Sequence, residues 1–448
     1  MTVAGRHQWG VADLGGTHIA THVSRRSRSG WTQLSGFFLV FATWLSLFGP
    51  IAPIFMMLGM AGVIASAPQQ FVFGLKRAAP ILIIGAIAMC SALWSTAPGV
   101  SLRYGVQLAI TLIAAIALAS SLPLGKLLRL FFLVSLTVMF LCILSGRQGA
   151  SASGPVLIGV LGSKNEMGTL CQLLVCNGAC LLFQRGEHLL VKLLSLFGML
   201  LGAVVLIFGF ATGAVLSTFM FGGLALVFII GSRLSSGAKV LLVFSVVILL
   251  LPLVVIRGDL ENYWEYFVVD VLHKDVGLTG RDYLWAHADR LIAERPILGY
   301  GYRSTWLGGS ADTIGLLRWA GLSNGAGFHF HDNYRELAVD FGLTGATIVC
   351  ACLGAGFFRL VKQALSPGLT SALIFFAATA ILSVIRAKVE VLIGPFNSST
   401  ILLVSTAVAG YLQGGARTLR PVRHRVFRFG QNMPQPASQS GEIRTTAE

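Results

Sequence analysis

Charged residues are scarce in this sequence, where they make up 11% of 448 residues against 55% hydrophobic ones. A soluble domain carries roughly a quarter of charged residues, so the composition excludes an ordinary water-soluble enzyme and predicts a polytopic membrane protein. Acidic residues are rarer than basic ones, with 18 against 33. Because the basic residues lie between apolar runs or near the chain ends, they indicate membrane orientation, and we expect no nucleic-acid partner.

Cysteine pairs and carboxylate clusters are also missing, which excludes two kinds of site. The seven cysteines all fall inside apolar runs and form no Cys-x-x-Cys pair, so neither a disulfide framework nor a zinc site is predicted. The carboxylates show no clear metal-binding pattern. We therefore expect no bound metal and no cofactor.

Long apolar runs are abundant. Runs of about 15 to 22 residues can cross a bilayer as helices, and we count twelve of them. They lie at 34–50, 51–67, 79–94, 106–122, 128–145, 167–183, 189–210, 212–231, 238–256, 340–358, 369–387 and 399–413. The predicted fold is an all-α polytopic membrane protein with about twelve transmembrane helices.

This pattern divides the chain into five predicted parts. They are a cytoplasmic N-terminal segment (1–33), transmembrane helices 1–9 (34–256), one large external loop with short helices (257–339), transmembrane helices 10–12 (340–415) and a basic, disordered cytoplasmic tail (416–448). Since about 80 residues without structure would be unusual inside a compact protein, the loop is expected to be functional.

Basic residues give the orientation of the helices, because cytoplasmic connections are enriched in Lys and Arg. With both termini in the cytoplasm, the inward connections carry Lys76 and Arg77, Lys126 and Arg129, Arg185 and Lys192, Arg233 and Lys239, and Arg359 and Lys362. Five cations lie in outward connections instead: Arg103, Arg147, Lys164, Arg386 and Lys388. Orientation does not explain these five, and cations at the outer membrane surface indicate an anionic ligand.

Two helices are predicted in the loop and its end. The first has Thr279 as N-cap with Asp282 three residues later. Its apolar face repeats at helical spacing through Leu284, Ala288, Leu291 and Ile292, and Pro296 ends the pattern. The second begins at Asn333, with Glu336 as its capping partner. His331 lies just ahead of that second helix, where the positive helix end attracts phosphate and lowers a histidine pKa, leaving a neutral imidazole able to accept a proton.

Four segments stand in a characteristic order. They are SALWSTAPGVSLRY (91–104), GSKNEMGTL (162–170), TGRDYLW with PILGYGYRS (279–285 and 296–304) and HDNYRELAVDFGLTG (331–345). Together they resemble the O-antigen ligase and Wzy-type polysaccharide polymerase superfamily, which includes ExoQ-like exopolysaccharide polymerases. One departure is Asp340, where the family usually has glutamate.

The resemblance implies a GT-C-like glycosyltransferase of the bacterial inner membrane that works on its periplasmic face. Its donor would be an oligosaccharide on undecaprenyl diphosphate; polymerases join the glycan to another repeat unit, whereas ligases transfer it to lipid A–core. Its other partners would be a glycan acceptor and membrane lipids, with a chain-length regulator and export proteins as further candidates. The resemblance also implies catalytic roles for His331 and Arg281, which match the family's loop histidine and arginine.

The remaining predicted site residues bind substrate. They are Arg103, Lys164, Asn165, Glu166, Asn333, Arg386 and Glu390. Ligases commonly carry a basic residue after a middle span, but residues 210–218 have none. This absence favours a polymerase, and Arg103, Lys164 or Arg386 could supply the charge.

Several structural alternatives remain open at this point. His329, His331 and Asp332 could be metal ligands, and Arg281 could pair with Asp282 or Asp289. Two further pairs, Lys164 with Glu166 and Arg386 with Glu390, could be purely structural. For the whole protein, a ligase is one alternative, and a twelve-helix secondary transporter is another from a different class. Transporters usually show related halves and charges near the bilayer midplane, and the sequence shows neither.

Overall fold

A computed structural model of the chain describes residues 30–45, 49, 51–149, 154–209, 211–239, 241, 244 and 280–413. The predicted N-terminal segment up to residue 29, most of the span 238–256, the first part of the loop and the tail lie outside these residues. The described part is largely helical, as predicted. Besides the helical stretch 30–42, its longer helices are α2 (Ile51–Ser66), α3 (Pro68–Arg77), α4 (Ala79–Cys90), α5 (Pro98–Ser121), α6 (Leu124–Ser145), α7 (Lys164–Leu182), α8 (Leu189–Phe208), α9 (Thr212–Gly231), α15 (Asn333–Ala364), α16 (Ser371–Arg386) and α17 (Ser398–Gln413).

Five of the described helices are long and apolar enough to cross a membrane: α5, α6, α8, α9 and α15. The pair α2 and α3 adds a sixth if it forms one span bent by 103°. Three apolar helices are shorter, at Ala79–Leu93, Ser371–Arg386 and Ser398–Leu412. These helices are those of a multi-pass all-α membrane protein, while the count of twelve stays a prediction.

Most predicted spans coincide with a helix, but none of the predicted spans covers α3. The apolar run at 51–67 ends in α2, and Pro68 then begins a new helix in a different direction. Proline favours the first turn of a helix because it has no N–H to leave unpaired there. The bend follows from this position of Pro68.

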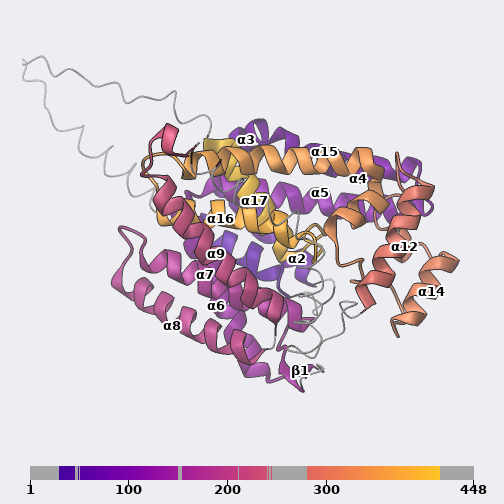
Figure 1. Cartoon of the computed structure of the whole chain (residues 1–448), viewed down its shortest axis with the longest axis horizontal. Helices are drawn as coiled ribbons and strands as arrows, with labels where there is room; N and C mark the ends of the chain where they lie inside the picture. Colours follow the sequence, from indigo (N-terminus) through magenta and orange to yellow (C-terminus); the bar gives the residue numbers. More distant parts are fainter. Residues whose placement is uncertain are drawn as a thin grey trace, which may run out of the picture. The chain divides into compact units, whose positions relative to one another are not determined.

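Small residues let the long helices approach closely. A Cβ on Gly410 of α17 would lie 1.9 Å from the carbonyl oxygen of Gly356 on α15, and a Cβ on Gly105 of α5 would lie 2.7 Å from that of Ala88 on α4. Close backbone approach through small residues is the usual way in which membrane helices pack. Figure 1 shows α15 beside α17 and α4, with which it packs.

Gly342 interrupts α15 with φ 68° and ψ 176°, a conformation in which only glycine is at ease. The turn that follows α12 (Arg281–Glu294) fits against the interruption. There the N–H of Leu343 donates to the carbonyl of Pro296 at 2.7 Å, and the Thr344 hydroxyl donates to that of Ile297. The loop is thereby fixed to the helix that leads into the membrane.

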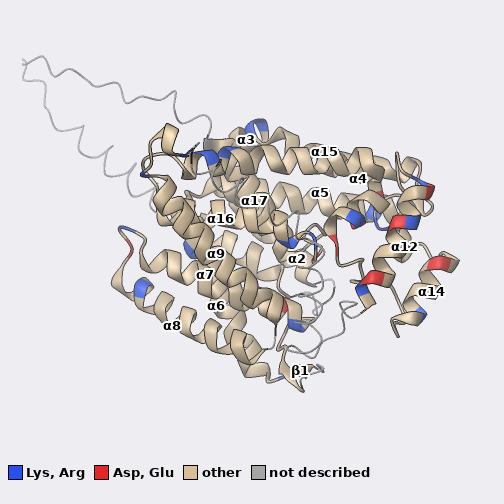
Figure 2. Cartoon of the chain, viewed as in Figure 1, with Lys and Arg blue, Asp and Glu red and all other residues tan. Residues whose placement is uncertain are grey.

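The helix ends form two polar regions, separated by apolar segments (Figure 2). At one end, Gln184 after α7 accepts a hydrogen bond from the N–H of Ala372 on α16 at 3.2 Å, and Lys239 donates to the carbonyl of Leu365 at 2.6 Å. We call this the basic end. The helix termini there carry Lys126, Arg129, Arg185, Lys192, Arg233, Lys239, Arg359 and Lys362.

The opposite end holds the starts of α7, α15 and α17, the end of α16, and the helices α12, α13 (Ser304–Leu307) and α14 (Ala311–Trp319). We call it the site end. It also carries a two-stranded hairpin, β1 (Gln148–Gly149) with β2 (Val156–Leu157), paired antiparallel. Arg147 supports this hairpin by donating to the carbonyls of Gly159 and Leu161. These contacts give Arg147, one of the five outward cations, a structural role.

Candidate active site

Arg281 occupies the first residue of α12. The N-cap of this helix is Gly280 with φ 83°, and no side chain caps it, which corrects the predicted cap at Thr279. The predicted inner face is confirmed, because Leu284, Ala288 and Leu291 are buried in one apolar cluster. Burial of that face turns α12 toward α15 and sets the position of Arg281.

Arg335 holds α12 against the start of α15. Its guanidinium donates to both carboxylate oxygens of Asp289 at 2.8 and 3.0 Å and to Asp332 at 2.7 Å, and it lies over the Trp285 ring. A planar guanidinium is suited to such paired contacts. Because Asp289 is occupied in this way, it is not the partner of Arg281.

Asp332 is the N-cap of α15, which corrects the predicted capping pair of Asn333 and Glu336. Its buried carboxylate accepts the backbone N–H groups of Tyr334 and Arg335. Unpaired N–H groups at a helix start need such an acceptor. Asp332 is therefore committed to the helix, which weakens its candidacy as a metal ligand.

The segment 329–331 is fixed on both sides of Phe330. The Phe330 N–H donates to Glu336 at 3.0 Å, and its carbonyl accepts from the Trp285 indole at 3.0 Å. Glu336 also accepts from the Trp306 indole at 3.0 Å. Both tryptophans thus support the loop that carries His331.

His331 adopts φ 55°, in the left-handed region. Burial, and secondly the charge of Arg281, lowers the pKa of His331 to about 4. The lowered pKa agrees with the predicted neutral imidazole, and its causes are burial and the charge of Arg281. Its Nδ1 is buried and has no hydrogen-bond partner among the described residues, so the protein leaves one hydrogen-bonding atom of this ring unsatisfied.

Glu390 lies in the connection between α16 and α17 and faces the histidines. One carboxylate oxygen of Glu390 and one ring nitrogen each of His329 and His331 lie within 4.8 Å of one another. Asn165 on α7 donates to Glu390 at 3.1 Å. Burial raises the pKa of Glu390, while Arg386 and Arg281 act in the opposite direction. Residues from four separate parts of the chain therefore meet here.

Asn333 positions the connection that carries Glu390. Its side-chain oxygen accepts the N–H groups of Leu392 and Ile393 at 3.0 and 3.2 Å, and its own N–H donates to Ala387 at 2.7 Å. The sequence predicts Asn333 to bind substrate, but these contacts give it a structural role. It ties the start of α15 to the loop beyond α16.

Arg386 is partly buried between the helices and donates to neutral groups. Its guanidinium donates to Gln172 at 3.0 Å and to Thr169 at 2.9 Å, both on α7. The Glu390 N–H donates to the Arg386 carbonyl at 2.9 Å, but among the described residues the two side chains form no direct salt bridge. A cavity of about 50 Å³ adjoins it, which has room for one or two water molecules.

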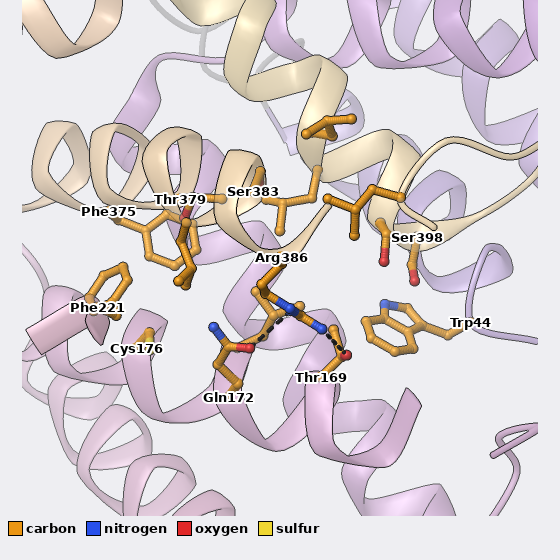
Figure 3. Close-up of a pocket in the computed structure, with 16 residues that line it drawn as sticks. Trp44, Thr169, Gln172, Cys176, Phe221, Phe375, Thr379, Ser383, Arg386 and Ser398 are labelled. Carbon is orange, nitrogen blue, oxygen red and sulfur yellow. Dashed lines mark hydrogen bonds between the residues drawn. The ribbon is translucent and has the colours of Figure 1, made fainter. Parts of the chain in front are cut away.

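Figure 3 shows the Arg386 guanidinium between Gln172 and Thr169, with Trp44 and Ser398 nearby. The cavity is lined by the aromatic rings of Trp44, Phe221 and Phe375 and by the hydroxyl groups of serine and threonine residues. The direct hydrogen-bond acceptors of this guanidinium are neutral, and Glu390 acts on its charge only from a longer distance. Such a group is suited to bind an anion.

Three of the predicted substrate-binding residues make no contact with this cluster in the described part of the chain. Arg103 is exposed and lies over the Tyr104 ring. Lys164 is exposed at the first residue of α7. Glu166 accepts the N–H of Gly162 at 2.7 Å in a capping box, while its own N–H donates to the Ser163 hydroxyl. Glu166 therefore caps α7 and does not pair with Lys164.

Sequence reasoning missed the partners of Arg386 and gave His329 only a metal role. Asn165, Thr169 and Gln172 lie four and three residues apart, so one face of α7 carries all three. A polar stripe at this spacing in an apolar helix was the signal that could have revealed them. His329 could not be assigned, because its hydrogen bond depends on the turn at His331.

Residues 197–350 match the model of the O-antigen ligase family. The chain is also 26% identical over 321 residues to "Exopolysaccharide production protein ExoQ" of Rhizobium meliloti (strain 1021), an alignment that covers 70% of this chain and 72% of that protein. The chain is therefore similar to proteins of the O-antigen ligase/Wzy-type family. The comparisons support a membrane enzyme of the polysaccharide polymerase or ligase type.

The family match helps to interpret the site. The matched residues 197–350 include Arg281 and His331, whereas Asn165, Arg386 and Glu390 lie outside them. The structure brings these two groups together across the site end. The O-antigen ligase/Wzy-type domain is therefore completed by helices on either side of it.

Proposed function

We propose that this protein polymerises glycan repeat units carried on undecaprenyl diphosphate, on the periplasmic face of the bacterial inner membrane. The observation that carries the proposal is the meeting of Arg281, His331 and Glu390, with Arg386 close enough for its charge to act on Glu390. Two cations, a neutral imidazole and a carboxylate supply what glycosyl transfer from a lipid diphosphate needs.

The leaving group accounts for the cations. When the acceptor oxygen attacks the anomeric carbon, the bond from that carbon to the diphosphate oxygen breaks and its electron pair leaves with the lipid diphosphate. Positive groups placed in advance stabilise this developing charge. Arg281 and Arg386 are proposed for that role, since Arg386 has only neutral hydrogen-bond partners in the described part.

The acceptor hydroxyl accounts for His331. Its proton must leave as the new glycosidic bond forms, and a neutral imidazole can take it or orient the hydroxyl. The lowered pKa keeps His331 neutral at neutral pH. Glu390, beside the same ring, would stabilise the imidazolium that results. We propose no metal in this step.

A second candidate is transfer of the glycan to lipid A–core, and the O-antigen ligase match over 197–350 favours it. Two observations favour the polymerase. The relative from Rhizobium meliloti is named for exopolysaccharide production, and residues 210–218 lack the basic residue common in ligases. Both candidates use the same donor and differ in the acceptor.

Surface-glycan analysis of a deletion strain tests the proposal. Loss of long free polymer, restored by the wild-type gene but not by His331→Ala at equal protein level, is the expected result. His287→Ala serves as the matched control, because His287 lies on α12 away from the cluster and should restore the polymer fully. Accumulated lipid-linked polymer beside a bare lipid A–core would instead identify a ligase, and an unchanged glycan profile would reject both.

A further inference from the structure

His329 has a role that neither the family resemblance nor the proposed chemistry assigns. Its Nδ1 accepts the backbone N–H of His331 at 3.1 Å. The two imidazole rings lie 4.2 Å apart between centroids and are inclined by 65°. His329 therefore contacts His331 through both its ring and its hydrogen bond.

That hydrogen bond stabilises an otherwise unfavourable backbone. His331 has φ 55°, and the left-handed region is sterically unfavourable for a residue with a side chain. The supports at Phe330 act on the preceding peptide through Glu336 and Trp285. Only the bond from His329, among the bonds described here, acts on the N–H of His331 itself.

The same bond determines the tautomer of His329. Burial, followed by the charges of His331, Arg303 and Arg281, lowers the pKa of His329 to about 3, so its ring is neutral. A neutral imidazole that accepts at Nδ1 carries its proton on Nε2. Neither nitrogen of His329 then has a free lone pair for a cation.

We propose that His329 is a positioning residue, which holds His331 in its left-handed conformation and directs that imidazole toward Arg281 and Glu390. The group of His329, His331 and Glu390 is consequently not a cation site, although its atoms are close enough for one. The proposal rests on the proposed function only in treating His331 as the catalytic group.

Four substitutions at position 329 test this role. Asparagine places an acceptor oxygen near the position of Nδ1, glutamine places it near Nε2, phenylalanine keeps the ring without an acceptor, and alanine removes both. With purified enzyme and a lipid-linked glycan donor, His329→Asn should keep kcat within about threefold of wild type. The other three should lose about tenfold or more in kcat, with little change in KM for the donor.

The comparison of Asn with Gln decides the test, because these two amides differ mainly in where the acceptor lies. Equal activity of the two at equal thermal stability, or a phenylalanine variant as active as the asparagine one, would overturn the positioning role. A purely structural role would instead lower stability in step with activity.

A second measurement does not depend on activity. When the purified wild-type protein is titrated with Zn²⁺ alone, we expect no stoichiometric binding at this group. Binding at the group would be recognised because His329→Ala or Glu390→Gln would remove it. Such binding would reject the inference even if no glycan transfer can be measured. Absence of any transfer by the wild type would count against the proposed function and leave the Zn²⁺ result to decide on His329.

Discussion

At the scale of single residues, Arg281 acts on every titratable group of the cluster. Its charge lowers the pKa of His331 and His329 and opposes the rise at Glu390. A nearby positive charge disfavours the imidazolium and favours the carboxylate, so in both cases it shifts titration to lower pH. The pH range of activity should therefore depend on the charge at position 281.

Replacing Arg281 by glutamine should move the acidic limb of the pH–activity profile to higher pH by about one unit. The sign follows because removal of the cation raises the pKa of His331 and of Glu390 alike. The position of the acidic limb is obtained from the residual rate of the variant, measured between pH 4 and 8 with excess donor. Arg281→Lys is the matched control, since it keeps the charge and should keep the limb. A limb that stays in place in both variants would show that Arg281 does not act on these groups.

The sequence predicted some site residues better than others. The structure brings together five predicted residues: Arg281, His331, Asn165, Arg386 and Glu390. Among them, Arg386 is the cation that lies against the orientation rule, whereas Arg281 and His331 were implied by the family resemblance. Asn333 and Glu166 have the right chemistry, but their oxygens accept backbone N–H groups. Which polar group faces a ligand and which faces the backbone depends on turns that a residue pattern does not specify.

At the scale of elements, the apolar periodicity located the helices but not their breaks. The inner face of α12 and the starts of α8 and α9 were predicted correctly. The bend at Pro68 and the interruption at Gly342 were not, because a run of apolar residues looks the same on either side of a break. Only the packing of the 296–298 turn against α15 explains why a glycine is needed there.

Gly342→Ala should destabilise the protein markedly. A Cβ at this position would lie 2.1 Å from the carbonyl oxygen of Ile297, and the backbone conformation is essentially confined to glycine. Together these cost about 3 kcal/mol or more, which should appear as a lower midpoint of thermal unfolding in detergent and as reduced activity.

Gly354→Ala is the control within the same helix. A Cβ at Gly354 would meet nothing within 4 Å, and alanine is a better helix former than glycine. Its unfolding midpoint should be equal to or above that of the wild type. Equal midpoints for the two variants would mean that the interruption of α15 is not required for the fold.

At the scale of the whole molecule, the two polar ends differ in charge. The basic end carries eight Lys and Arg residues at the helix termini, which the orientation rule assigns to the cytoplasm. The site end carries the outward cations, three of which make specific contacts there. Arg147 supports the hairpin, Lys388 lies 3.9 Å from Asp332, and Arg386 lines the cavity. The orientation rule therefore predicts that the proposed chemistry faces the periplasm, where we expect the donor to be exposed.

Labelling of single cysteines tests this orientation. Ser323 at the site end and Ser236 at the basic end are both exposed, so Ser323→Cys and Ser236→Cys are a matched pair. Because Cys90 and Cys350 are the exposed native cysteines, both are replaced by serine in the background. A membrane-impermeant maleimide added to intact spheroplasts should label position 323, and it should label position 236 only after lysis. Labelling in the reverse order would place Arg281 and His331 in the cytoplasm, where the donor glycan would have to be used before export, and the proposed periplasmic polymerisation would be wrong.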